Sequence, residues 1–96
     1  MAELFSREDI FLEEVVEATQ DVDVSNELVV YNDDVNTFDW VIVSLIEICD
    51  HSSTQAEQCT LLIHFKGKAS VKHGALGGLK AMRQALIDRG ISCTIE

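Results

Sequence analysis

Four side chains that could bind a cation or take part in acid-base chemistry stand out in the sequence. Asn32, Asp33 and Asp34 are consecutive, and His64 follows about thirty residues later. Asn and Asp also populate turns, because their side chains hydrogen-bond to the local backbone, so a turn explains the triplet taken alone. A lone histidine at the end of an apolar helical segment is likewise more often a packed or surface residue than a ligand. The four residues become informative only if the fold brings them together.

The same residues, alone or together with a cysteine, could form two other kinds of site. Asp33, Asp34 and His64 could ligate a metal, but no second close His or Cys completes a recognisable ligand spacing. A Cys-His-Asp hydrolase would need Cys49 or Cys59 as its nucleophile, yet each cysteine lies within an apolar helix face, where a structural thiol is the default. Loss of activity with thiol-blocking reagents would reveal such a hydrolase. We expect no metal, no cofactor and no enzymatic activity.

The elements around the four residues predict how they meet. Leu28–Tyr31 is a β-branched and aromatic run, which indicates a strand that stops at the Asn-Asp-Asp turn. A helix capped by Asn36 is expected over residues 36–49, and a second one over residues 53–65. Because only a few residues join these helices, they must pack as antiparallel neighbours. That packing carries His64 back towards the turn, beside apolar side chains of both helices.

The remaining boundaries follow from local chemistry. Ser52 and Gln55 resemble a capping box for the second helix, and Gly67 is a natural stop for it. A third helix ends before Gly90, which is the expected left-handed cap.

Two further strands complete the pattern. Residues 69–73 and residues 91–95 alternate between apolar and polar side chains, as half-buried strands do. The order strand, helix, helix, strand, helix, strand in so short a chain favours an α+β domain with three helices on one face of a small sheet.

Charge divides the chain into two parts. Of a net charge of −10, residues 1–26 carry eight acids and one base, and residues 27–96 carry nine acids and six bases. We expect residues 1–26 to be a flexible acidic N-terminal extension, with a possible short helix, and residues 27–96 to be the folded core domain. Three widely spaced cysteines favour reduced thiols over a disulfide framework.

The composition also narrows the partners and the location. Nucleic acids and anionic membranes are polyanions that need clustered Lys and Arg, so neither is an expected partner. No apolar run approaches the roughly 20 residues of a membrane span, and no secretory signal is present, so a cytoplasmic protein is expected. A protein or peptide partner remains.

Several motifs together resemble the ClpS family of Clp protease adaptors over about residues 27–96. The motifs are V-V-Y-N-D-D at 29–34, F-D-W-V-I at 38–42 with Leu45, Ala56 in the second helix, I-H-F-K-G-K at 63–68 and C-T-I-E at 93–96. Any one of them alone would be a weak signal, whereas the combination is specific.

The resemblance implies three helices on a three-stranded antiparallel sheet that recognises N-degrons, meaning substrates with a free, bulky, hydrophobic first residue such as Phe, Leu, Tyr or Trp. In the family, residues matching Asn32, Asp33 and His64 hold the substrate's α-amino group. An α-ammonium has three donors and one charge, and an amide oxygen, a carboxylate and a neutral imidazole can accept all three hydrogen bonds.

The resemblance also implies an apolar pocket for the first side chain. By position, its wall comprises Phe38, Val41, Thr60, Ile63 and Ile91, and its rim comprises Asp34 and Asn36. The family often has Thr, Pro and Met where this chain has Asn36, Thr37 and Phe38, and a Met where it has Thr60. We therefore expect a shifted ranking among Phe, Tyr, Trp and Leu.

The implied partners are an AAA+ unfoldase of the Clp family, similar to ClpA, together with its protease. Lys80 matches a basic residue on the surface that docks to the unfoldase, and residues 1–26 occupy the place of the segment that engages it during delivery. The main rival is a structural interaction domain of the same fold without amino-terminal recognition. That rival predicts that Asp33→Ala and His64→Ala leave partner binding intact.

Overall fold

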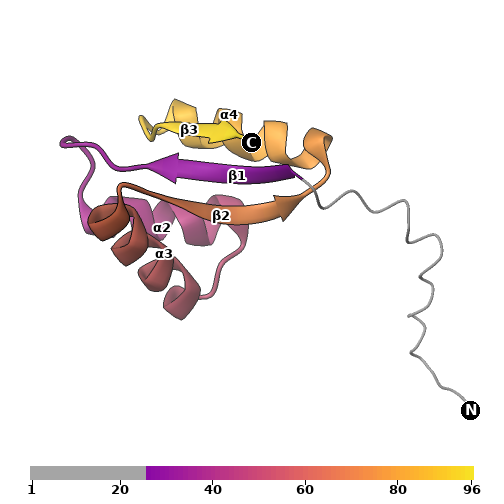
Figure 1. The fold of residues 1–96 in the computed structure, drawn as a ribbon. Coiled ribbons are helices and arrows are strands. Elements are labelled where there is room, and N and C mark those ends of the chain that lie inside the picture. Colours follow the sequence, from indigo (N-terminus) through magenta and orange to yellow (C-terminus); the bar gives the residue numbers. More distant parts are fainter. Residues whose placement is uncertain (1–25) are drawn as a thin grey trace, which may run out of the picture.

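A three-stranded antiparallel sheet and three helices form residues 26–96, the part of the chain that the structure, a computed structural model, describes (Figure 1). The strands are β1 (Asn26–Tyr31), β2 (Lys68–Gly74) and β3 (Cys93–Ile95), and the helices are α2 (Phe38–Cys49), α3 (Ser53–Lys66) and α4 (Leu76–Asp88). Their order along the chain is the predicted one, and the predicted α+β class is confirmed. The expected flexibility and short helix of the extension fall on residues 1–25, outside the described range, whereas Asn26, the last residue assigned to the extension, is the first residue of β1.

The central strand carries the Asn-Asp-Asp turn. The strand order is β2-β1-β3, with a register shift between Leu28 and Val29 where β1 pairs with β2. At the end of β1, Tyr31 N–H donates to Ser92 O at 2.9 Å and Asn32 N–H donates to Gly67 O at 2.9 Å. Backbone bonds on both sides therefore fix the point at which the chain leaves the sheet.

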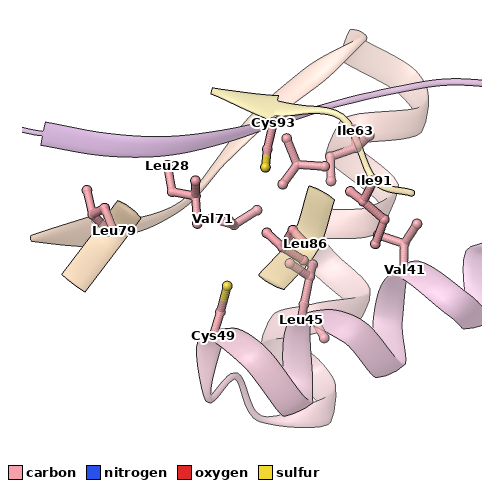
Figure 2. Close-up of a cluster of buried hydrophobic side chains, with 12 residues drawn as sticks. Leu28, Val41, Leu45, Cys49, Ile63, Val71, Leu79, Leu86, Ile91 and Cys93 are labelled. Atoms are coloured by element: carbon pink, nitrogen blue, oxygen red, sulfur yellow. The ribbon is translucent and has the colours of Figure 1, made fainter. Parts of the chain in front are cut away.

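The helices share one face of the sheet. Leu28 and Val30 alternate along β1 and so point to the same side, where they join one buried cluster with side chains from all three helices (Figure 2). Leu45 of α2 and Leu86 of α4 are fully buried in this cluster, and Ile63 of α3 is nearly so. The prediction of three helices on one face is confirmed.

The predicted cap of the first helix is wrong by one residue. Thr37, not Asn36, has the extended N-cap conformation, and its hydroxyl accepts a hydrogen bond from Trp40 N–H at 3.1 Å. Asn36 cannot serve as the cap because its side chain is bonded elsewhere. In α3 the predicted capping box of Ser52 and Gln55 is present in both directions.

The closing strand is shorter than residues 91–95. Gly90 N–H donates to Ile87 O at 2.9 Å and Ile91 N–H donates to Leu86 O at 3.0 Å, which is the pair of bonds of a Schellman motif. Gly90 has φ +81°, as predicted for the residue after the helix. The end of α4 thus takes Ile91 out of the sheet ladder, and its side chain is buried in the core cluster.

Candidate functional site

A cavity of about 260 Å³ opens between the β1–α2 loop, the start of α2 and the end of α3. It is lined by Asn32, Asp33, Asn36, Thr37, Phe38, Val41, Thr60, Ile63 and His64. Polar groups come from the loop and from His64, whereas Phe38, Val41 and Ile63 supply an apolar wall. The antiparallel packing of α2 and α3 brings the two sets of residues together.

Asp33 is held by its own turn. Its Oδ1 accepts the backbone N–H groups of Val35 at 2.9 Å and Asn36 at 2.8 Å, and its Oδ2 accepts the Asn36 side-chain amide at 2.7 Å. The backbone N–H of Asn36 is the main cause that holds the pKa of the Asp33 carboxyl below its ordinary value, and partial desolvation opposes it. Asp33 is therefore a fixed negative charge at the cavity.

His64 lies between two phenyl rings at the mouth of the cavity. Its ring centroid is 5.2 Å from that of Phe38 and 4.8 Å from that of Phe65, both in edge-on geometry. Edge-on aromatic contacts are favourable and restrict the ring orientation. The imidazole is exposed, so it can reach a ligand that enters the cavity.

The wall of the cavity contains one buried hydroxyl. Thr60 is 3% exposed, and its hydroxyl donates to Ala56 O one helical turn earlier at 2.7 Å. Because its hydrogen is engaged within α3, Thr60 can line an apolar cavity without an unsatisfied donor. A threonine also leaves more space there than a longer side chain would.

Ile91 lines a second, smaller cavity of about 20 Å³. Both cavities share Asn32, Asp33, Asn36, Val41 and Ile63, so the smaller one continues the larger one towards the sheet. Ile91 thus lies beyond the main cavity, at the corner between α4 and β3.

Most of the expected site residues line the main cavity, but Asp34, Ile91 and Lys80 do not. Asp34 is exposed and lines neither cavity, Ile91 lines only the smaller cavity, and Lys80 is exposed on α4. Thr37 also lines the main cavity, although the sequence did not predict it as a site residue. Its place between Asn36 and Phe38, both expected at the pocket, was the available signal.

The structure argues against the two other sites considered. Within residues 26–96, no group of three or more His, Cys, Asp or Glu side chains is placed to hold a metal ion. Burial raises the pKa of the Cys49 thiol to about 11 and also raises the pKa of Cys59, so neither thiol is activated as a nucleophile. Neither cysteine lines the cavity that contains His64.

Comparison with known proteins extends these observations. The model of the family described as ATP-dependent Clp protease adaptor protein ClpS matches residues 23–94. Among solved structures, Agrobacterium tumefaciens ClpS2 bound to L-phenylalaninamide matches with a TM-score of 0.68 and 19% identity, over 74% of this chain and 93% of that chain. Identity this low establishes a shared fold alone. The search of the curated proteins gives no match.

The family match covers most of the chain, including the three helices described in residues 26–96 and the cavity. ClpS proteins are adaptors and not catalysts, which confirms the expectation of a non-enzymatic protein. None of the helices described in residues 26–96 is long and apolar enough to cross a membrane. The chain belongs to the ClpS family, the adaptor proteins of the ATP-dependent Clp protease.

Proposed function

We propose that this adaptor binds the free α-amino group and the bulky hydrophobic first side chain of N-degron substrates, and delivers them to a Clp-family AAA+ unfoldase in the cytoplasm. The observation that carries the proposal is the cavity, in which Asn32, Asp33 and His64 adjoin an apolar wall. Polar acceptors next to an apolar space match a ligand that has an ammonium group beside a large hydrocarbon side chain.

The polar end suits an α-ammonium. The Asn32 side-chain oxygen, the Asp33 carboxylate and a neutral His64 nitrogen can accept its three hydrogen bonds. The fixed negative charge of Asp33 matches the positive charge of the ligand. An acetylated amine has neither the charge nor the three donors, so it should not bind.

The apolar end suits an aromatic or long aliphatic side chain. A dry cavity of about 150 Å³ holds a benzene ring, so the volume of about 260 Å³ leaves room for a ring and its linking methylene. Burying such a side chain contributes about 1.5–3 kcal/mol, and charged hydrogen bonds contribute about 1.5–3 kcal/mol each before the costs of association are subtracted. Neither part alone should give useful affinity.

The likeness to a solved relative supports the same ligand class. Agrobacterium tumefaciens ClpS2 is bound to L-phenylalaninamide in that structure. This molecule has a free α-amino group, a benzyl side chain and an amide in place of the next residue. Its functional groups are those that the cavity of this chain would accommodate.

The test is fluorescence anisotropy with otherwise identical labelled peptides that begin with Phe, Leu, Met, Val or N-acetyl-Phe. Binding of the free Phe and Leu peptides without binding of the Val and N-acetyl-Phe peptides is the expected result. If none of the five binds, the chain is a ClpS-family domain without amino-terminal recognition. Attention would then turn to the substituted positions Asn36, Phe38 and Thr60.

A further inference from the structure

The side chain of Asn36 links the Asp33 turn to the end of α4. Its Nδ2 donates to Asp33 Oδ2 at 2.7 Å and to the backbone carbonyl of Gly90 at 2.9 Å, across 54 positions of sequence. The residue is half-buried and lines both cavities. The NH₂ group of Asn36 therefore connects the β1–α2 loop, which contains the charged Asp33, to the α4–β3 connection, which contains Gly90 and Ile91.

A side-chain amide suits the chemistry at this position. Both partners of Nδ2 are acceptors, a carboxylate and a carbonyl, so the group between them must supply two hydrogens. A serine or threonine hydroxyl has one hydrogen and could satisfy one partner only. An aspartate has none and would place a second negative charge against Asp33.

The link also determines how Asp33 meets a ligand. A carboxylate has about four acceptor positions. Two of them, on Oδ1, are filled by the backbone N–H groups of Val35 and Asn36, and one, on Oδ2, is filled by the Asn36 amide. Among residues 26–96, no second donor is bonded to Oδ2, so one of its positions remains for an incoming donor.

We propose that Asn36 is a positioning residue, which holds the Asp33 carboxylate so that its one vacant acceptor position faces the α-ammonium of the substrate. This inference rests on the proposed function. Without the Asn36 amide, Asp33 Oδ2 loses the one hydrogen-bond partner that it has within residues 26–96, and the loop loses its side-chain bond to Gly90.

A matched control is available at the same corner. Trp40 Nε1 donates to the carbonyl of Arg89, the residue before Gly90, at 3.1 Å, and its ring lies under the Arg89 guanidinium. Trp40→Phe removes one hydrogen bond from α2 to this corner and keeps an aromatic ring, without touching Asp33. Trp40→Phe therefore distinguishes the loss of a hydrogen bond to the Arg89–Gly90 backbone from the loss of the hydrogen bond that positions Asp33.

The experiment compares the wild-type chain with Asn36→Ala, Asn36→Ser and Trp40→Phe. Each is titrated with three labelled peptides: one beginning with free Phe, one with free Leu, and one with a 3-phenylpropionyl group, which keeps the benzyl group and lacks the amine. In parallel, the pKa of Asp33 in the free protein is followed by ¹³C NMR of its carboxyl carbon.

For Asn36→Ala we expect the affinity for both free-amine peptides to fall by roughly tenfold, which corresponds to the lower end of the contribution of one hydrogen bond to a charged group. The ratio of Phe to Leu affinity and the weak affinity for the 3-phenylpropionyl peptide should stay within twofold. The pKa of Asp33 should rise, because a donor to its charged form is removed. Asn36→Ser should fall between Asn36→Ala and wild type, and Trp40→Phe should match wild type.

Two results would overturn the inference while the proposed function stands. One is wild-type affinity in Asn36→Ala and Asn36→Ser; the other is equal losses in Asn36→Ala and Trp40→Phe with no change in the Asp33 titration. Should Asn36→Ala fail to fold, Asn36→Ser decides the question alone. A wild-type chain that binds none of the peptides would overturn the proposed function, and the positioning role with it.

Discussion

The charge of Asp33 should be worth about tenfold in affinity, and only for ligands that have an α-ammonium. Asp33→Asn tests this, because an amide oxygen can still accept the backbone N–H groups of Val35 and Asn36 that shape the turn. The negative charge and the vacant acceptor position on Oδ2 are lost. The Asn36 amide also loses an acceptor, which affects every ligand alike.

The magnitude follows from the exposure of the site. A hydrogen bond to a charged group contributes about 1.5–3 kcal/mol when it is sheltered from water. Asp33 is only half-buried, so solvent screens part of its attraction and the lower value is appropriate. About 1.5 kcal/mol corresponds to roughly a tenfold change in Kd.

The assay is a double-mutant cycle by competition anisotropy. Wild type and Asp33→Asn are each measured against a free Phe peptide and the matching 3-phenylpropionyl peptide, and the difference between the two losses isolates the coupling of carboxylate to ammonium. Asp34→Asn is the control, because it removes a neighbouring carboxylate that is exposed and lines neither cavity. Equal losses for both peptides in Asp33→Asn, or an equal effect of Asp34→Asn, would refute the reasoning.

Three further predictions follow from the site and the proposed delivery. Thr60→Met extends a side chain into the cavity of about 260 Å³. Affinity for a Trp-first peptide should therefore fall at least about fivefold relative to affinity for a Leu-first peptide. An unchanged ratio of the two affinities in anisotropy titrations would contradict this prediction. A chain without residues 1–24 keeps β1 and should bind the Phe peptide normally, yet fail to stimulate degradation by the Clp unfoldase and protease; full degradation would contradict the proposed delivery. Lys80→Glu should weaken binding of the adaptor to the unfoldase, and unchanged binding would contradict the proposed docking role of Lys80.

The features that the sequence predicted well depend on residues close together in the chain. The capping box joins Ser52 to Gln55, and the left-handed stops fall at Gly67 and Gly90. Such interactions span three to six positions and need no tertiary partner. Hydrophobic periodicity likewise predicted each helix and strand described in residues 26–96, with errors only at the ends.

One of the two boundary errors has a tertiary cause and the other has a local one. Asn36 has the chemistry of an N-cap, but its amide is committed to Asp33 and to Gly90, 54 positions away, so Thr37 caps the helix. Ile91 alternates like a strand residue, yet its N–H completes the Schellman motif of α4. At Asn36 the local preference was overruled by a bond to a distant element, whereas at Ile91 the helix cap overruled the strand pattern.

The sequence by itself determined the types of the site residues and the order of the elements that carry them. An Asn-Asp pair after a strand and a histidine on the second of two antiparallel helices must approach each other, because the connections are short. Only the tertiary structure decided that Asp33 and not Asp34 lines the cavity, that Thr37 joins it, and that Ile91 lies in a smaller cavity behind it. Neighbouring positions in a loop have no fixed periodicity, so their directions depend on the hydrogen bonds that the packed elements offer.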